Sequence, residues 1–166
     1  MGKKKTIHKF IFPTLTSNYF IRVSSVAILA YLFFTYLFIP VHISGTSMEP
    51  TYHDGSINFT WRLHYLFNKP ERYDIVTVRF AGKKVMLLKR VVALAGETVE
   101  FKNGKLLVNG KKIEEPYVRY PCNWDLEPRL VEEGNVYLVG DNRNMPLKQH
   151  TFGQTSIKRI MGVPLW

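Results

Sequence analysis

Residues 85–95 read VMLLKRVVALA, an apolar run that contains only two charged residues, Lys89 and Arg90. Successive side chains of a β-strand point to opposite faces, so each face of this run is apolar except for one basic residue. That pattern is typical of a strand buried on both sides. We therefore predict a long strand over residues 84–95, with Lys89 and Arg90 pointing in opposite directions.

Shorter runs around this segment predict a mostly β fold with little helix outside the N-terminal region. Alternating or apolar stretches predict strands at residues 56–61, 73–80, 98–102, 105–108, 136–139 and 157–163. Residues 81–83 predict a turn. The dipeptide Asn103-Gly104 predicts a type I′ turn, because both of its positions need the positive φ that Asn and Gly tolerate.

Residues 111–133 are rich in charge and contain three prolines, Pro116, Pro121 and Pro128. We predict an irregular insertion there. A lid, a surface for a partner and a plain insertion are all compatible with its composition.

An uncharged segment near the start of the chain predicts a membrane anchor. No Lys, Arg, Asp or Glu occurs between Val23 and Met48. As a helix, residues 23–39 would be about 26 Å long, close to the roughly 30 Å of bilayer hydrocarbon. We therefore predict a single transmembrane helix over residues 19–40, which Pro40 ends.

The anchor separates a short basic tail, residues 1–18, from a folded domain, residues 41–166. Five of the 23 basic residues lie within residues 1–22, where there is no acidic residue. Because basic residues favour the cytoplasmic side of a span, we expect the N-terminus in the cytoplasm and the folded domain outside. A net charge of +10 is compatible with nucleic-acid binding. A basic cluster beside a span instead favours an anionic membrane surface, and we predict no nucleic-acid partner.

Two other interpretations of the apolar segment were weighed. A cleaved secretion signal has a shorter apolar run followed by an Ala-x-Ala-like site, and no such site follows Ile39. A buried core helix would show a polar face, whereas polar side chains are few in this segment. The sequence favours an uncleaved anchor.

The sequence offers no basis for a disulfide or a metal site. Cys122 is the only cysteine, so an intramolecular disulfide is impossible. No pair of Cys or His residues has zinc-like spacing, and we expect no metal and no cofactor. Cys122 as a nucleophile is an alternative, but its loop-like surroundings lack the signature of a cysteine enzyme. We assign no role to His42, His53 and His64.

Residues 44–51 read SGTSMEPT and follow the apolar segment closely. A serine among small residues and a proline is ordinarily a turn. However, a serine hydroxyl is a weak nucleophile that needs a base, and a lysine kept neutral in an apolar site is such a base. Burial lowers a lysine pKa from about 10.4 by up to about 3–5 units, so Lys89 could take the proton from Ser47 and return it to a leaving amine. The alternative is that Lys89 extends to a strand edge and stays solvated.

Arg90 keeps its charge when buried and therefore needs an acidic partner. We predict an ion pair between Arg90 and Asp141, which would join the long strand to the turn at residues 140–143.

Three stretches, in this order, resemble the type I signal peptidases. They are GTSMEPT at residues 45–51, KRVVALAGE at residues 89–97, and GDNR at residues 140–143 followed by Gly153. The resemblance covers the chain from about the anchor to its end. It implies a mostly β fold on the outer face of a bacterial cytoplasmic membrane.

The resemblance also implies a reaction and its residues. Ser47 would be the nucleophile and its backbone N–H an oxyanion donor, and Lys89 would be the general base. Structural support of the site would come from Arg90, Asp141, Arg143 and Gly153. The substrates would be exported precursor proteins, cut after small residues at the first and third positions before the cleavage site, with membrane lipids and the secretion machinery as further partners. Ser47 follows Ile39 by eight positions, a reach of at most about 28 Å, so cleavage would occur close to the bilayer.

The last motif departs from the family pattern. Many members continue after GDNR with a serine and then Asp-Ser-Arg, whereas this chain has Pro146 at the serine position and Lys148 and His150 in place of the acidic and basic residues. Pro146 removes a hydroxyl that would orient the lysine, and Gly45 removes a side-chain oxyanion donor found in some members. His150 is a candidate orienting group, and an ordinary surface-loop histidine is the alternative.

The sequence leaves other functions open beside a signal-peptidase-like enzyme. One is a specialised relative that cuts a narrow substrate, such as a pilin or a conjugation component. Another is an inactive membrane-anchored module that binds exported peptides. Retention of Ser47 and Lys89 favours an enzyme, whereas the altered residues 144–150 favour the inactive module.

Overall fold

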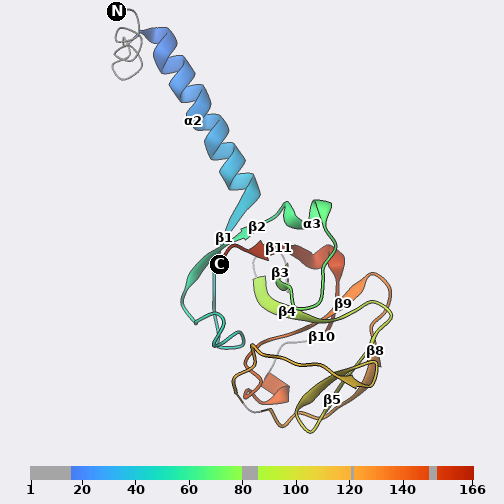
Figure 1. The fold of residues 1–166 in the computed structure, drawn as a ribbon. Helices are drawn as coiled ribbons and strands as arrows, with labels where there is room; N and C mark the ends of the chain where they lie inside the picture. Colours follow the sequence, from blue (N-terminus) through green and yellow to red (C-terminus); the bar gives the residue numbers. More distant parts are fainter. Residues whose placement is uncertain (1–15, 80–85, 121, 150–152) are drawn as a thin grey trace, which may run out of the picture. The chain divides into compact units, whose positions relative to one another are not determined.

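A computed structural model of the chain describes residues 16–79, 86–120, 122–149 and 153–166. Contacts divide the chain after Leu37 into an N-terminal helical unit and a β unit, Phe38–Trp166 (Figure 1).

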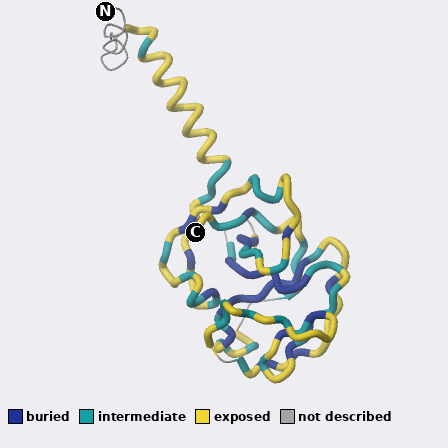
Figure 2. Tube along the Cα trace, viewed as in Figure 1, coloured by how far each residue is buried: buried dark blue, intermediate teal, exposed yellow. Residues whose placement is uncertain are grey.

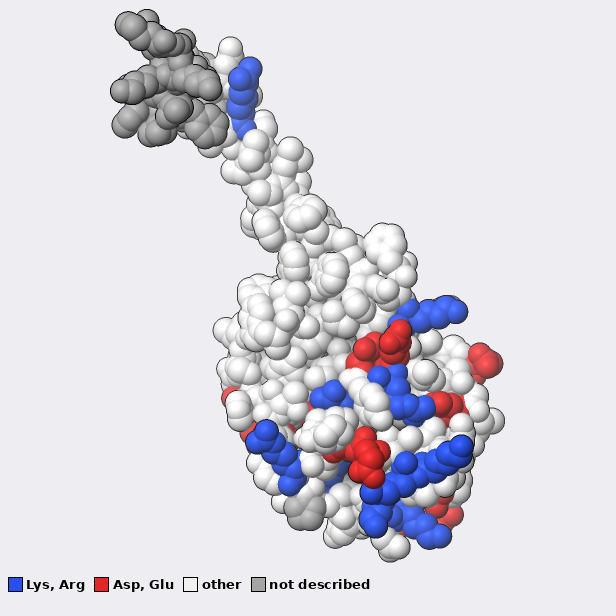
Figure 3. All heavy atoms as spheres, in the orientation of Figure 1, with Lys and Arg blue, Asp and Glu red and all other residues white. Residues whose placement is uncertain are grey.

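The helical unit contains α2, Ser17–Leu37. Its 21 residues are long and apolar enough to cross a membrane, and none of them is buried against protein. Arg22 is the only charged residue of α2, and Figure 3 shows the remainder of the helix without charge. These properties fit a membrane anchor near the N-terminus.

The anchor differs from the predicted range of 19–40 at both ends. The helix begins at Ser17 and ends at Leu37, and Pro40 does not end it. Pro40 instead lies in β1, Phe38–His42, opposite Phe59. The sheet tolerates a residue without an N–H there because β1 is an edge strand.

The β unit contains two antiparallel sheets. The seven-stranded sheet has the order β1-β2-β11-β3-β4-β9-β10, and the four-stranded sheet has the order β7-β6-β5-β8. The strands of the large sheet, besides β1, are β2 Ile57–Trp61, β3 Ile75–Arg79, β4 Met86–Leu94, β9 Asn135–Val139, β10 Gly153–Ser156 and β11 Ile160–Pro164. The small sheet contains β5 Thr98–Lys102, β6 Lys105–Val108, β7 Lys111–Lys112 and β8 Leu126–Leu130. Helix in the described part of this unit is limited to α3 His64–Phe67 and two short 3-10 turns, η1 Leu147–Gln149 and η2 Ile157–Arg159.

The predicted mostly β fold is therefore confirmed, and β4 is the long buried strand expected at residues 84–95. The Asn103-Gly104 turn has the expected positive φ at both residues, 49° and 71°. A side chain at Gly104 would also collide with the carbonyl oxygen of Cys122, 1.8 Å from an added Cβ. The turn predicted at residues 81–83 lies outside the described residues.

Two strand predictions need correction. The segment predicted as a strand from residue 157 begins with η2, whose first turn is capped by the Ser156 side chain, and β11 starts only at Ile160. The strand β10 was not predicted, because its sequence GQTS has no apolar periodicity.

Residues 111–133 were predicted to be irregular, but part of this segment forms strands. They include β7, which pairs with β6, and β8, which pairs with β5, so the segment forms both edges of the small sheet. The predicted irregularity rested on the charge of the segment and on its three prolines, of which Pro128 lies within β8. Proline is compatible with an edge strand because one side of the strand makes no ladder hydrogen bonds.

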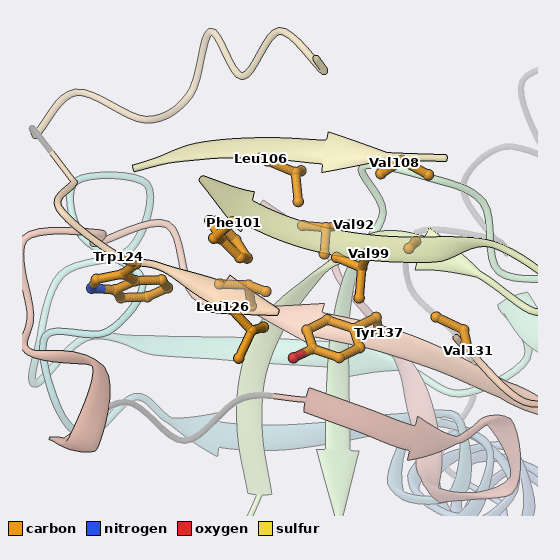
Figure 4. Close-up of a cluster of buried hydrophobic side chains, with 11 residues drawn as sticks. Val92, Val99, Phe101, Leu106, Val108, Trp124, Leu126, Val131 and Tyr137 are labelled. Atoms are coloured by element: carbon orange, nitrogen blue, oxygen red, sulfur yellow. The ribbon is translucent and has the colours of Figure 1, made fainter. Parts of the chain in front are cut away.

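The main core lies where the two sheets meet. It joins side chains of β4 and β9 with side chains of the small sheet and its connections, as Figure 4 shows for Val92, Phe101, Trp124 and Tyr137. A register shift between β4 and β9 occurs at residues 91–93. This bulge places the neighbours Val92 and Ala93 in one cluster, so the predicted two-residue alternation does not extend to the end of the strand. Figure 2 shows the buried segments concentrated within the β unit.

Candidate active site

The serine motif lies in the connection between β1 and β2, and an apolar side chain holds it against β4. Met48 is almost completely buried and packs with Ile43 and with Leu88 of β4. Gly45 has a φ of 93° and donates its N–H to Asp54 Oδ1 at 2.7 Å. This local arrangement brings Ser47, next to Met48 in the chain, to the face of β4.

Ser47 and Lys89 are in direct contact. Lys89 Nζ lies 2.5 Å from Ser47 Oγ, within hydrogen-bonding distance. Lys89 lies in β4 opposite Val76 of β3 and is only 4% exposed. The alternative in which Lys89 extends into solvent is therefore wrong.

Burial lowers the pKa of Lys89 from 10.5 to about 8, although the negative charge of Asp141 acts in the opposite direction. With that pKa, about a tenth of the lysine is neutral at pH 7. A neutral amine can accept the Ser47 hydroxyl proton along the same short contact. The arrangement can thus generate a serine nucleophile near neutral pH.

Arg90 and Asp141 form the ion pair that the sequence predicts. Arg90 Nε and Nη2 donate to the two oxygens of Asp141 at 2.9 and 2.6 Å. The side chain of Asp141 is completely buried, and that of Arg90 is 10% exposed. Thr51 also donates its hydroxyl to Asp141 Oδ2 at 2.5 Å. Asp141 therefore connects β4 to the serine motif, a connection through Thr51 that the sequence did not reveal.

The next residue, Asn142, contacts the nucleophile loop directly. Its backbone N–H donates to the carbonyl oxygen of Ser47, and its side-chain amide donates to the carbonyl oxygen of Thr46, both at 3.0 Å. Sequence reasoning assigned Asn142 no role. Its place inside the GDNR stretch was the signal that could have identified it.

Arg143 is buried, and its side-chain hydrogen bonds go to Gly140 and Glu115. Its Nε donates to the carbonyl oxygen of Gly140 at 2.8 Å, and its two Nη atoms donate to Glu115 at 3.0 and 2.5 Å. Gly153, the other predicted support residue, starts β10 opposite Leu138. Among the described residues, Gly153 makes no hydrogen bond to Ser47 or Lys89.

Two further predictions concern groups around the reacting pair. His150, the candidate orienting group, lies outside the described residues. Within the described ranges, Lys89 Nζ makes its one side-chain hydrogen bond with Ser47 Oγ, and the backbone N–H of Ser47 has no hydrogen-bond partner. None of the described residues therefore prevents this N–H from donating to an oxyanion.

A small, mainly apolar groove adjoins Ser47. It has a volume of ≈ 20 Å³ and is lined by Val41, His42, Ile43, Ser44, Gly45, Ser47, Met48, Met86, Leu87 and Leu88. These residues come from the end of β1, the serine motif and the start of β4. A larger pocket of ≈ 490 Å³, beside Trp124 and Pro146, contains neither Ser47 nor Lys89.

The described residues contain no cluster of three or more His, Cys, Asp or Glu side chains that could hold a metal ion. Cys122 is half-buried, and burial raises the pKa of its thiol. A thiol with a raised pKa is a poor nucleophile near neutral pH.

The family model described as signal peptidase, peptidase S26, matches residues 16–164. The chain belongs to this family. A signal peptidase I from Bacillus licheniformis is 35% identical over 146 residues, which cover 81% of this chain and 78% of that protein. A probable thylakoidal processing peptidase 2 from Arabidopsis thaliana is 38% identical over 131 residues, 74% of this chain. The match spans only 36% of that plant relative's length.

A crystal structure of a signal peptidase I from Enterococcus faecalis is also similar, with 26% identity and a TM-score of 0.47. The similarity covers 58% of this chain and 97% of that one. A TM-score below 0.5 adds nothing to the family assignment, which rests on the sequence matches.

The buried ion pair predicts a large effect of Asp141→Ala on stability. The substitution leaves the Arg90 guanidinium buried without its carboxylate, and removing one partner of such a pair costs about 3–5 kcal/mol. Denaturant unfolding of the detergent-solubilised protein measures this loss. Glu114→Ala is the matched control, because Glu114 pairs with Lys112 on the surface, where both side chains are more than half exposed, and should cost no more than about 1 kcal/mol. Equal losses for the two variants would contradict the proposed importance of the buried pair.

The lowered pKa of Lys89 predicts the pH dependence of any reaction that uses it as a base. Below pH 8 the neutral fraction of the amine, which alone can accept a proton, falls about tenfold for each unit of pH, and kcat/KM should fall with it. Above it, kcat/KM should reach a plateau. A pH–rate profile between pH 6 and 10 measures the midpoint, which we expect near the Lys89 pKa of about 8. A midpoint near 10.5, or a rate that is constant between pH 6 and 9, would exclude this role.

Proposed function

We propose that this chain is a membrane-bound serine endopeptidase that removes signal peptides from exported precursor proteins. The observation that carries the proposal is the 2.5 Å contact between Ser47 Oγ and a lysine amine that is 4% exposed, in a chain of the signal peptidase family. Ser47 is the nucleophile, and Lys89 is the general base.

The reaction proceeds in two steps. Neutral Lys89 takes the proton of Ser47 as Oγ attacks the carbonyl carbon of the peptide bond that is cut. The carbonyl oxygen becomes an oxyanion, which accepts a hydrogen bond from the backbone N–H of Ser47. The protonated lysine then gives its proton to the leaving amine, and an ester between Ser47 and the signal peptide remains.

Hydrolysis of this ester restores the enzyme. Lys89, neutral again, takes a proton from a water molecule as the water attacks the ester carbonyl. The lysine finally returns the proton to Ser47 Oγ as the signal peptide leaves. The cycle uses no metal or organic cofactor.

The groove beside Ser47 supports a preference for small side chains before the cut. Its walls include the end of β1 and the start of β4, and the substrate binds there as an extended strand. The small volume and mainly apolar lining favour Ala-sized side chains at the first and third positions before the cut.

The apolar helix α2 supports a membrane location, and the proposed membrane is the bacterial cytoplasmic membrane. The basic residues before α2 favour a cytoplasmic N-terminus, with the β unit outside. The β unit itself exposes large apolar side chains on β2, α3 and the end of the chain: Ile57, Phe59, Trp61, Leu66, Phe67, Leu165 and Trp166. Aromatic and aliphatic side chains of this kind favour contact with lipid headgroups and acyl chains, in support of membrane lipids as a partner. The secretion machinery is a further proposed partner, since it delivers the precursors.

The other functions considered from the sequence gain no support from the relatives. These relatives are named as signal peptidases and thylakoidal processing peptidases, which favours neither a narrow pilin-type substrate nor an inactive module. Acidic and basic side chains are interspersed on the visible face of the β unit (Figure 3), unlike the single-sign surface expected for nucleic-acid binding.

A cleavage assay with the full-length protein in detergent tests the proposal. A synthetic precursor segment with alanines at the first and third positions before the cut is the substrate, and mass spectrometry of the products identifies the cleaved bond. Ser47→Ala and Lys89→Ala should each lower kcat by at least about 10⁴-fold, because each removes a group that takes part in bond formation. Lys112→Ala, at an exposed lysine of the small sheet, should leave the rate unchanged. Cleavage that survives both active-site substitutions would exclude the mechanism.

A further inference from the structure

A short turn in the 111–133 segment contacts both arginines next to the proposed active site. We define it as the 114–118 turn, which is closed by a hydrogen bond from the Val118 N–H to the Glu115 carbonyl oxygen at 3.0 Å. The Glu115 side chain is only 10% exposed. It accepts two hydrogen bonds from Arg143 and one from the Tyr117 hydroxyl, the last at 2.6 Å.

Arg143 depends on Glu115 for its charge compensation. Its side chain is completely buried, and its guanidinium lies over the rings of Phe101 and Trp124, at 5.3 and 5.9 Å from their centroids. Residues 144–152 include no Asp or Glu, and position 148 is a lysine. The carboxylate that a buried guanidinium requires therefore comes from a distant segment, the 114–118 turn.

The same turn supports Arg90. The Tyr117 ring packs on the Arg90 guanidinium, 3.9 Å from its centroid. Arg90 in turn holds Asp141 through the bidentate ion pair. The 114–118 turn thus contacts Arg143 directly, and it supports Asp141 indirectly, through Arg90. Together these contacts fix the two residues on either side of Asn142.

Asn142 connects this arrangement to the nucleophile. It donates from its backbone to the Ser47 carbonyl oxygen and from its side chain to the Thr46 carbonyl oxygen. A displacement of Arg143 would move Asn142, its neighbour in the chain, and with it the backbone of Ser47. The distance from Ser47 Oγ to Lys89 Nζ depends on that backbone position.

We propose that Glu115 is a positioning residue for the Ser47–Lys89 pair, acting through Arg143 and Asn142. The carboxylate touches neither Ser47 nor Lys89, and it lies outside the groove beside Ser47. Its loss should therefore lower kcat and leave KM and the pKa of Lys89 unchanged. This inference rests on the proposed function, because it concerns the same reaction.

The variant Glu115→Gln tests the proposal, since it keeps the shape of the side chain and removes its charge. We expect kcat per folded molecule to fall roughly ten- to hundredfold, the size of effect that a small misplacement of a reacting group produces. KM should change less than about twofold, and the midpoint of the pH–rate profile should stay at that of the unsubstituted protein, because Glu115 contacts none of the residues that line the groove and does not contact Lys89. Glu114→Gln, on the same turn but exposed, should match the unsubstituted protein.

The double variant Glu115→Gln/Arg143→Gln keeps the test decisive if Glu115→Gln alone folds poorly. Removal of both charges leaves no buried ion unpaired, so this variant should fold better than the single one. Its kcat should fall no further than that of Glu115→Gln, because both substitutions remove the same contact.

Three results would overturn the proposal. They are an unchanged kcat in folded Glu115→Gln or in the folded double variant, a loss confined to KM, and losses in the single variants Glu115→Gln and Arg143→Gln that multiply in the double variant. If the unsubstituted protein fails to cut the precursor, the proposed function fails. If it cuts and folded Glu115→Gln cuts equally well, only the role of Glu115 fails.

Discussion

The proposed chemistry depends on one buried amine, that of Lys89, which forms no ion pair with a carboxylate among the described residues. Lys89 lies in a strand covered on both faces, and burial lowers its pKa towards neutrality. A carboxylate in contact with the amine would restore the charged form and remove its basicity. Asp141 is close enough to raise the pKa of Lys89, but its two oxygens are occupied by Arg90 and Thr51. The ion pair with Arg90 therefore keeps Asp141 from pairing with Lys89, the neighbour of Arg90 in the chain.

The turn at residues 141–143 organises the site through three neighbouring side chains. Asp141 holds β4 through Arg90, Asn142 holds the serine motif, and Arg143 holds the 114–118 turn. The proposed nucleophile and base come from different segments of the chain, and this turn connects both of them to the 114–118 turn beside the small sheet. We infer that the small sheet thus helps to set the distance between Ser47 and Lys89. Its side chains also form part of the main core.

Local patterns predicted much of this arrangement. The apolar run around Lys89 predicted a buried strand, because a strand covered on both faces cannot carry many polar side chains. The pair Arg90–Asp141 followed from the cost of burying an unpaired guanidinium. The Asn103-Gly104 turn followed from backbone geometry, which is a property of the two residues themselves.

Features that depend on tertiary contacts could not be predicted in this way. Pro40 and Pro128 suggested a helix end and an irregular segment, but both residues lie in edge strands, and only the sheet order shows which strands are edges. The roles of Asn142 and Glu115 depend on contacts with residues distant in the chain, for which the sequence carries no periodic signal. The bulge at residues 91–93 likewise results from the pairing of β4 with β9.

The central claim concerns the protonation state of one side chain, and NMR titration of lysine-labelled protein in detergent measures it directly. The signal of Lys89 is identified by its absence from the spectrum of a Lys89→Met variant. We predict a titration midpoint near 8, at least two units below that of the exposed lysines. A midpoint near 10.5 would show that the amine stays charged at neutral pH, and the proposed role of Lys89 as a base would be wrong.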